Sequence, residues 1–436
     1  MKFVFFTPFA KASAIGRVTA LLLDAAERMG HTAVVVRTER EDLLEAAPFA
    51  CQVPVLRWTD AAQVEATARD ADALVYQIGN NYSYHTGGLH WLRRLPGIVC
   101  LHDFLLAHLF AEWAQGRRDE ASAVLASWYG EQAPAEFFQA SDSTPQDFAA
   151  TASRSYPMTE WICAEALAVV SHGHWGMPRV AASCPGPLRV LPLPYDSPGA
   201  TAADQAAGHE GRIRILTVGH VNPNKRVESV IRAIGSSAQL RNKVSYRLCG
   251  LIQPNVAEEL EDLAGALGVE LVISGETDDA DLQRAMVEAD IACCLRWPSF
   301  EAASATTIEA LLYGKATVVS NAAFYSELPD DCVRKIEPTA EVLDLRHALE
   351  ELVSDPGARR AMAERGQAWA RRTFGAESYV VSLAELARLA AAAQPVIEMA
   401  ETASAILGGW DAPPALIEAE EIAGPLRLFE NGGAHE

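Results

Sequence analysis

The feature that most constrains the fold is an alternation of short apolar segments with amphipathic segments, which runs from the first residues to about residue 390. Short apolar runs separated by helical patterns indicate parallel β-sheets with helices on both faces. The alternation stops at a small, polar segment, 196–211, and then restarts. At 436 residues the chain is also too long for one ordinary domain. We therefore expect an α/β protein with two doubly wound domains.

The pattern also predicts where the parts of the chain begin and end. The predicted parts, in chain order, are a first domain at 1–195 with a helical insertion at about 104–160, a linker at 196–211, a second domain at 212–375, a helix crossing back to the first domain at 376–394, and an acidic tail at 395–436. Strands are predicted at Phe3–Thr7, Ala33–Arg37, Val55–Trp58, Ala73–Tyr76, Ile98–Leu101, Ala168–Val170, Arg214–Val218, Ser245–Leu248, Leu271–Ile273, Ile291–Leu295 and Thr317–Val319.

The charge of the chain is strongly negative and unevenly distributed. The net charge is −21, made up of −6 in residues 1–200 (15 − 21) and −15 in residues 201–436 (21 − 36). A field of this sign repels polyphosphates, so nucleic acid is not an expected partner. The less acidic first half is the side on which we would place a peripheral membrane contact.

The sequence gives no sign of export or of a metal site. The apolar start is short and interrupted by Pro8, which favours a first strand over a signal peptide, and no run approaches the ~18 apolar residues of a membrane span. Eight cysteines show no metal-binding spacing, and neither do the histidines around positions 85–90 and 172–174. We expect a cytoplasmic protein, in solution or at the inner face of the cytoplasmic membrane, with reduced thiols.

The loops after the strands are the places to search for chemistry, because open α/β sheets bind ligands beyond the carboxyl ends of their strands. The first strand of each half leads into a loop without the G-x-G-x-x-G pattern, and the chain has no P-loop. These absences argue against a dinucleotide-dependent enzyme and against a nucleoside triphosphatase.

A basic pair stands in the loop after the first strand of the second half. Lys225 and Arg226 directly precede a predicted helix. Two cations beside the free amides of a helix start are suited to a diphosphate. A solvated basic turn is the alternative reading of the same pair.

Two glutamates follow the predicted strand Ile291–Leu295. Glu301 lies in the loop and Glu309 on the next helix. A carboxylate on such a helix can accept both hydroxyls of a ribose, while the loop carboxylate can hold sugar hydroxyls. Small residues at the predicted helix start let a phosphate approach the backbone amides closely. These are Ser304, Ala305 and Thr306.

These motifs together resemble those of the retaining glycosyltransferase family 4. The run Pro298-Ser299-Phe300-Glu301 … Glu309-Ala310-Leu311 … Gly314-Lys315 … Val318-Val319 resembles the signature that carries the family's two glutamates, and Val218-Gly219 … Lys225-Arg226 resembles its V-G-R-x-x-x-x-K-G loop. The resemblance extends over roughly residues 1–390. In the first half it rests on Gly16, Gly30-His31, Tyr76–Asn81, Leu101–Phe104 and Val169–His172.

The resemblance implies a GT-B fold, two Rossmann-like domains that face each other across a cleft. It also implies transfer of a hexose-type sugar from a UDP- or GDP-sugar with retention of configuration, without a metal or cofactor, to a hydroxyl of a glycan, a lipid-linked glycan or a small molecule. Within the family, the motifs resemble those of the bacterial members that build surface polysaccharides. The implied catalytic residues are Lys225 for the diphosphate, Glu301 for the donor sugar and His102 facing that sugar; the implied donor-binding residues are Gly16, Gly219, Arg226, Ser304, Ala305, Thr306 and, for the ribose, Glu309.

Five residues at four places depart from the family pattern. His220 stands where an arginine is usual, Arg226 replaces a glycine, Ala302-Ala303 replaces a glycine-rich pair, and Ala316 replaces a proline. These departures keep two alternatives open: a non-catalytic nucleotide-sugar-binding partner subunit, and an epimerase or phosphorylase on the same fold. The sequence leaves open the base, the sugar, the acceptor, the linkage and the oligomeric state.

Overall fold

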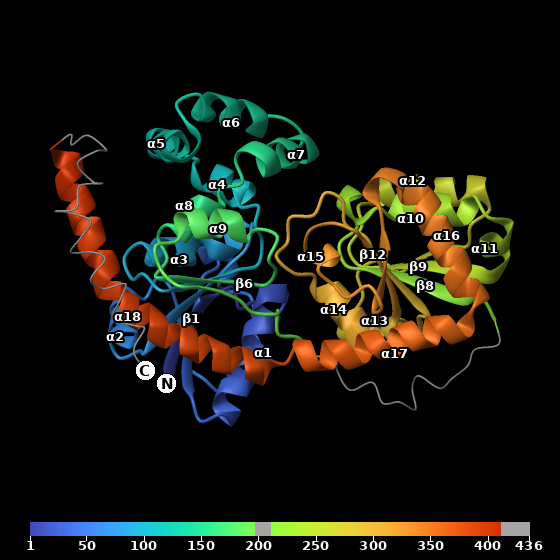
Figure 1. Cartoon of the computed structure of the whole chain (residues 1–436), viewed down its shortest axis with the longest axis horizontal. Helices are drawn as coiled ribbons and strands as arrows, with labels where there is room; N and C mark the ends of the chain where they lie inside the picture. The colour runs from blue at the N-terminus through green and yellow to red at the C-terminus, as the bar shows by residue number, and fades with distance from the viewer. Residues whose placement is uncertain (197–210, 411–436) are drawn as a thin grey trace.

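The computed structural model describes residues 1–196 and 211–410, which form two α/β domains (Figure 1). In the described part of the chain, each domain has one parallel sheet, of seven strands in the first and six in the second. The strand orders are β3-β2-β1-β4-β5-β6-β7 and β10-β9-β8-β11-β12-β13. Each order reverses direction once, beside β1 in the first sheet and beside β8 in the second. The expected pair of doubly wound domains is therefore confirmed.

The bounds of the first domain's elements are as follows. Its strands are β1 (Lys2–Thr7), β2 (Thr32–Arg37), β3 (Val55–Arg57), β4 (Ala73–Ile78), β5 (Ile98–Leu101), β6 (Ala168–Ser171) and β7 (Leu188–Val190). Its helices are α1 (Ala14–Arg28), η1 (Glu41–Leu43), α2 (Ala61–Arg69), α3 (Tyr82–Leu92), α4 (Ala107–Trp113), α5 (Arg118–Tyr129), α6 (Ala133–Ser141), α7 (Pro145–Ser155), α8 (Thr159–Cys163) and α9 (Met177–Ser183).

The second domain follows the same plan. Its strands are β8 (Ile213–Val218), β9 (Val244–Cys249), β10 (Leu271–Ile273), β11 (Ile291–Cys294), β12 (Ala316–Ser320) and β13 (Val333–Ile336). Its helices are η2 (Pro223–Lys225), α10 (Val227–Gly235), α11 (Ala238–Lys243), α12 (Pro254–Leu267), α13 (Asp279–Glu288), α14 (Ala305–Leu312), α15 (Ala323–Ser326), η3 (Pro338–Ala340), α16 (Glu341–Ser354) and α17 (Pro356–Thr373), after which α18 (Ala376–Gly409) ends the described chain.

Both faces of each sheet are buried, as the continuous apolar strands predict. Along β1, Phe3 and Phe5 enter the core beneath α1 and α18, while Val4 and Phe6 enter the core shared with the helical insertion. In β8, Ile215 and Leu216 divide in the same way between two cores of the second domain. A strand buried on both faces points its alternate side chains into different cores, which is the pattern of a doubly wound sheet.

Several elements differ from the sequence prediction. The edge strands β7 and β13 and the helices α16 and α17 were not among the predicted elements. The predicted insertion at 104–160 consists of α4 to α7 and the start of α8, packed around buried aromatic side chains. The predicted linker lies almost wholly outside the described residues, because only Asp196 and Gly211 of it are described.

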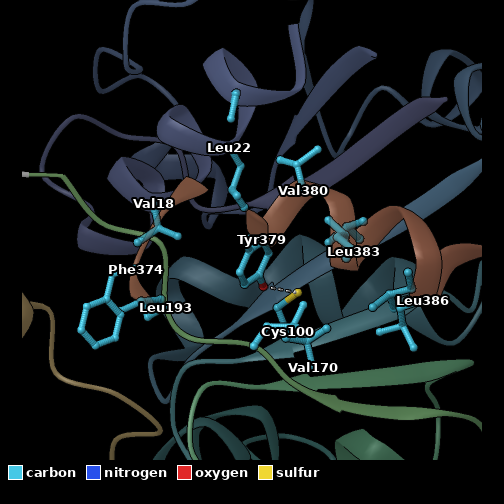
Figure 2. Close-up of a cluster of buried hydrophobic side chains, with 14 of the residues drawn as sticks. Val18, Leu22, Cys100, Val170, Leu193, Phe374, Tyr379, Val380, Leu383 and Leu386 are labelled. Carbon is cyan, nitrogen blue, oxygen red and sulfur yellow. Dashed lines mark hydrogen bonds between the residues drawn. The ribbon is translucent and has the colours of Figure 1, made fainter. Parts of the chain in front are cut away.

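The helix predicted at 376–394 crosses to the first domain and is longer than expected. It is α18, which passes through Pro395 and reaches Gly409, so residues 395–409 of the predicted tail belong to this helix. The rest of that tail, 411–436, lies outside the described residues. The first half of α18 packs on the first domain, where Tyr379 bonds to the Cys100 thiol and Leu383 and Leu386 are fully buried (Figure 2).

The helices α17 and α18 together form a segment with one further property. Over Pro356–Gly409 the chain is long and apolar enough, by length and composition, to cross a membrane. Of its most apolar window, 39% is buried inside the protein, and core helices of soluble proteins pass the same test. In the first half of α18 one face is buried against the first domain, while Val381 and Leu389 on the other face are exposed.

Candidate active site between the domains

The two sheets bring their functional loops to one place. In an open parallel sheet the ligand crevice lies outside the carboxyl ends of the strands, where the strand order reverses. In the second domain that point is between β8, which leads to Lys225, and β11, which leads to Arg296. In the first domain His102 and Asp103 follow β5. The loops of the two domains meet directly, because Asp103 and Glu301 form an antiparallel β-bridge.

Lys225 is a buried cation at the second-domain side. Its side chain is 6% exposed, and its ammonium donates to the Val218 carbonyl. Burial and the nearby Arg296 lower the pKa of Lys225 to about 7. Gly219 has a φ of 92°, and a β-carbon there would lie 3.0 Å from the Lys225 ammonium. Glycine at 219 therefore leaves room for the lysine and for the turn.

The side chain of Arg226, which follows Lys225, points away from the cavity beside that lysine. Arg226 has a left-handed φ of 56°, the conformation for which the family pattern uses glycine. Its guanidinium pairs with both oxygens of the Glu341 carboxylate at 3.0 Å, at the start of α16. Arg226 thus joins two helices of the second domain and is not among the residues that line the cavity beside Lys225. His220 is exposed.

Glu301 is held by partners from its own domain. Its carboxylate pairs with Arg296 at 3.2 Å and accepts a hydrogen bond from the Tyr325 hydroxyl. Its carbonyl accepts the indole N–H of Trp175, a first-domain residue, at 3.2 Å. Arg296, Tyr325 and Trp175 were not among the predicted site residues.

Helix α14 begins where the small residues 304–306 predicted a helix start. Ser304 is its N-cap, and the Ser304 hydroxyl accepts the Thr307 amide at 3.4 Å. Ala305 and Thr306 form the first turn and are partly exposed. Ser304, Thr306, Lys225 and Arg296 line one cavity of about 10 Å³. The cations of two adjacent strands and the start of one helix thus converge on a single point.

Glu309 lies on α14 and is 6% exposed. Burial raises the pKa of the Glu309 carboxyl to about 6, against the attraction of Arg17. Arg17 belongs to α1 of the first domain, and its guanidinium lies 3.8 Å from the Glu309 carboxylate and 4.6 Å from the centre of the Tyr195 ring. Arg17 was not among the predicted site residues, and no local sequence signal links it to Glu309.

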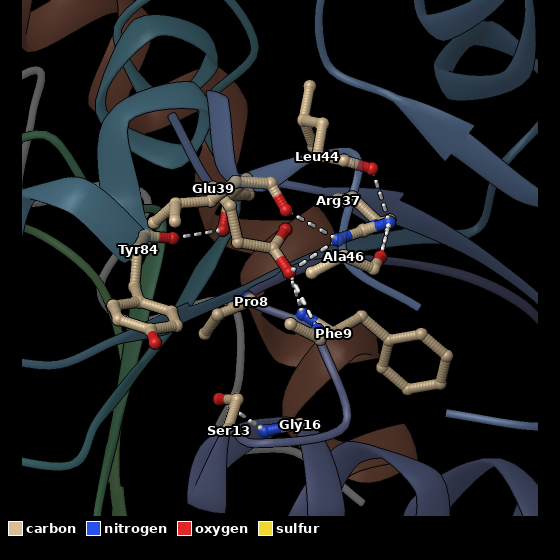
Figure 3. Close-up of polar contacts among 12 residues, drawn as sticks. Pro8, Phe9, Ser13, Gly16, Arg37, Glu39, Leu44, Ala46 and Tyr84 are labelled. Atoms are coloured by element: carbon tan, nitrogen blue, oxygen red, sulfur yellow. Dashed lines mark hydrogen bonds and ion pairs between the residues drawn. The ribbon is translucent and has the colours of Figure 1, made fainter. Parts of the chain in front are cut away.

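Gly16 precedes Arg17 and sits inside α1 rather than in the loop before it. A β-carbon at Gly16 would lie 2.8 Å from the Pro8 carbonyl oxygen, so glycine lets this loop pack on the helix. Ser13 caps the helix by accepting the Gly16 amide at 3.0 Å. The buried Glu39 carboxylate then pins the loop by accepting the amides of Phe9 and Ala10 at 2.8 and 2.7 Å (Figure 3). Gly16 thereby fixes the place of Arg17.

The His102 imidazole is neutral and partly buried among first-domain residues, while the His102 backbone lies at the domain interface. Its imidazole bonds to the Gln77 side-chain carbonyl at 2.6 Å, and its ring centre lies 5.0 Å from that of His172. Burial, together with His172 and His85, lowers the pKa of His102 well below the ordinary value. Next to it, Asp103 accepts the Asn80 amide at 3.0 Å, and burial and Glu301 raise the pKa of the Asp103 carboxyl to about 7.

Backbone bonds close the interface around these residues. The Ala302 amide donates to the His102 carbonyl at 2.9 Å, and the Phe104 amide donates to the Phe300 carbonyl at 2.8 Å. Glu327 adds a further link, since its carboxylate accepts the His174 and Trp175 amides at 2.8 Å each. Within residues 1–196 and 211–410, no group of three or more metal-ligating side chains is arranged to hold a metal ion.

The comparisons with known proteins agree with this geometry. Residues 201–369 match the family of glycosyl transferases group 1. A search of curated proteins gives no match. Among solved structures, sucrose-phosphate synthase from Thermosynechococcus elongatus is similar with a TM-score of 0.62 at 13% identity, covering 89% of this chain and 98% of that one.

Two further structures have the same architecture. Anabaena Alr3699/HepE, solved in complex with UDP and glucose, has a TM-score of 0.59 at 17% identity over 88% of this chain and 98% of its own. WaaG, a glycosyltransferase involved in lipopolysaccharide biosynthesis, has a TM-score of 0.56 at 15% identity over 87% and 98%. The chain therefore has the GT-B fold, and the group 1 match of its second domain supports a glycosyltransferase.

Proposed function

We propose that this protein is a retaining glycosyltransferase that moves a hexose-type sugar from a UDP- or GDP-sugar to a hydroxyl group, without a metal ion. The observation that carries the proposal is the convergence of Lys225, Arg296 and the first turn of α14 on one cavity at the reversal point of the second sheet. Two cations and a helix start are suited to a diphosphate. That HepE, which shares this fold, was solved with UDP supports a nucleotide-sugar donor.

In the proposed reaction, the bond between the anomeric carbon and the β-phosphate oxygen breaks, and its electron pair leaves with the diphosphate. The acceptor oxygen bonds to the same face of that carbon, and its proton passes to the departing diphosphate. Lys225 and Arg296 stabilise the negative charge that develops, which is the largest single contribution to such reactions. Glu301 and the neutral His102 hold the sugar, and Glu309 holds the ribose.

The proposal requires the domains to separate when the donor enters. A cavity of about 10 Å³ is far smaller than the several hundred Å³ of a typical ligand pocket. Arg17 also occupies the Glu309 carboxylate that would meet the ribose. Binding of the donor must therefore break the ion pair between Arg17 and Glu309 and open the contact between Glu301 and Asp103.

The same closed contact is the specific observation that favours a second candidate, a nucleotide-sugar-binding partner subunit without turnover. Ala302 lies in the segment that is usually glycine-rich in the family, and its buried side chain packs into the core of the first domain. If this loop stays fixed, a nucleotide can bind while the sugar cannot reach the acceptor.

A test that needs no acceptor is slow transfer to water. We expect the protein to hydrolyse UDP-glucose or a GDP-hexose in EDTA, and to release the sugar with the donor's own anomeric configuration, read by NMR before mutarotation. Glu301→Gln is expected to lower this rate at least about tenfold, because Glu301 holds the sugar. Release of the inverted anomer would refute retention. Nucleotide binding without turnover for any donor would favour the partner subunit.

A further inference from the structure

A chamber of about 590 Å³ opens between the domains next to the candidate active site. Its first-domain wall comes from α7, α9 and the loop after β5, and its second-domain wall from residues 297–300 and the start of α15. In Figure 1, α7 and α9 lie on the side of the first domain that faces α15. The chamber is large enough for most of a sugar-sized or drug-sized molecule.

The walls of the chamber are rich in aromatic side chains from both domains. Phe104 and Trp175 meet edge to face with ring centres 4.7 Å apart, and both line the chamber. Phe300 and Trp297 line the opposite wall, and Trp297 is 44% exposed. Exposed aromatic surface of this kind in a concave site favours a ligand with an apolar part.

The charged residues of the chamber are all positive. Arg154 and Arg179 line it, and none of the lining residues is acidic, in a chain whose net charge is −21. Arg179 pairs with Glu160 at 2.8 Å, outside the lining. Among the described residues Arg154 forms no ion pair, so its guanidinium is available to an anion. This charge is the reverse of what a random patch of this chain would carry.

Two details of the second-domain wall point to an occupant. The Ser299 hydroxyl is shielded from solvent and has no hydrogen-bond partner among the described residues, although it lines the chamber. A buried hydroxyl without a partner costs free energy unless something else satisfies it. Ala323 lines the same wall with a left-handed φ of 49°, a strained conformation for a residue with a β-carbon.

The chamber also lies where an acceptor must approach. Phe300 directly precedes Glu301, and Phe104 directly follows Asp103, so the chamber begins one residue from each side of the contact between the domains. Opening that contact for the donor sugar would join the chamber to the reacting carbon. A molecule held in the chamber is therefore placed to present its hydroxyl there.

We propose that this chamber binds the acceptor, and that the acceptor joins an apolar group to a negatively charged group, as in a sugar carried on a lipid phosphate. The inference rests on the proposed function and narrows its acceptor class. The aromatic walls bury the apolar group, while Arg154 and Arg179 bind the anion. A neutral free glycan could stack on the aromatic walls but would leave the arginine pair unused.

The test compares three probes by calorimetry on the full chain: geranyl phosphate, geraniol and inorganic phosphate. We expect saturable binding of geranyl phosphate at least about tenfold tighter than either of the other two, since each carries only one of its two groups. Arg154→Gln and Trp297→Ala are each expected to weaken geranyl phosphate binding about fivefold or more. Arg360→Gln, an exposed arginine on α17, is the matched control and should leave it unchanged.

UDP binding by the same samples separates this inference from the proposed function. If UDP binds and geranyl phosphate does not, the acceptor class is wrong while the transferase proposal stands. Equal binding of inorganic phosphate or of geraniol would also overturn the inference, as would geranyl phosphate binding that Arg154→Gln and Trp297→Ala leave intact. If UDP fails to bind wild-type protein, the proposed function itself fails.

Discussion

At the scale of single residues, the candidate site depends on ionisable groups whose burial sets their charge. Lys225 has a pKa of about 7, so in the free protein it carries a full charge only below neutral pH. A diphosphate bound beside its ammonium would raise that pKa strongly, because an opposite charge at close range favours the charged form. The lysine is thus suited to take up a proton when the donor arrives and to hold the leaving group.

This leads to a prediction about proton uptake. We expect UDP binding at pH 8 to be accompanied by the uptake of as much as one proton per protein molecule. Calorimetry in buffers of different ionisation enthalpy measures this uptake, which should disappear in Lys225→Met. The hydrolysis rate of that variant should fall about 100-fold or more. Lys315 is a matched control, because its pKa is also lowered by burial, to about 8, and it bonds to the Val287 carbonyl away from the cleft. Lys315→Met should keep the proton uptake.

A second prediction concerns Asp103 and the dependence of protein stability on pH. Burial and Glu301 raise its folded-state pKa to about 7, above the ordinary value of 3.8, so the folded protein holds this proton more tightly than the unfolded chain. The associated stability is therefore fully present below pH 3.8 and is lost as the pH rises to about 7. Asp103→Asn should raise the Tm relative to wild type by an amount that grows from pH 4 to 7.5.

The control residue is Asp70, whose pKa is shifted in the opposite direction. Asp70 is exposed and bonded to Lys2, which lowers the pKa of its carboxyl. Asp70→Asn should therefore change the Tm little, and any loss should appear at high rather than low pH. A Tm difference for Asp103→Asn that does not vary with pH would show that the carboxyl is not buried as described.

At the scale of elements, α18 is the helix that ties the end of the described chain to the first domain. Leu386 is fully buried against the first domain, whereas Leu389, on the same helix, is 44% exposed. Leu386→Ala is expected to lower the free energy of unfolding of the first domain by about 2–5 kcal/mol, since it leaves a cavity. Leu389→Ala should change it by less than about 0.5 kcal/mol. Urea unfolding followed by circular dichroism measures both, and equal effects would contradict this packing.

The elements were predictable where local pattern determines them. Apolar runs located most strands, and the helix start at Ser304 followed from small residues after a strand. The edge strands β7 and β13 were missed, because their partly exposed residues lack a continuous apolar run. The extension of α18 was missed because Pro395 usually ends a helix, yet here the helix continues through it.

The second-domain part of the site was predictable from the strand-and-loop pattern, whereas His102 and Gly16 of the first domain were implied only by the family resemblance. Lys225, Glu301 and Glu309 follow strands of the same sheet, so the strand-and-loop pattern alone brought them to one edge. Arg17 reaches Glu309 from the other domain, and sequence periodicity carries no information about such a contact. Arg226 was predicted as a phosphate contact, but its left-handed backbone turns the side chain toward Glu341.

At the scale of the whole molecule, the Glu327 side chain of the second domain forms hydrogen bonds to the first domain. Its carboxylate accepts two first-domain amides and lies 3.0 Å from the His174 imidazole. Hydrogen bonds to a charged group contribute about 1.5–3 kcal/mol each. Removal of this carboxylate should therefore favour the separated arrangement of the domains that the donor needs.

Amide hydrogen exchange measures this directly. In Glu327→Ala, exchange of the interface amides of Ala302 and Phe104 is expected to be about tenfold faster or more, because both bond across the interface. The control is Glu337→Ala, since Glu337 bonds to Asn321 within the second domain. Unchanged exchange at Ala302 in Glu327→Ala would show that the Glu327 hydrogen bonds do not hold the two domains together.

The central claim is that a nucleoside diphosphate binds at the reversal point of the second sheet without a metal ion. Calorimetric titration of the full chain with UDP and GDP in EDTA, on wild type and Glu309→Gln, tests it most directly. We predict micromolar binding of one of the two nucleotides and at least about tenfold weaker binding by the variant, which loses the carboxylate for the ribose. Failure of both nucleotides to bind wild-type protein, or equal binding by Glu309→Gln, would contradict the account.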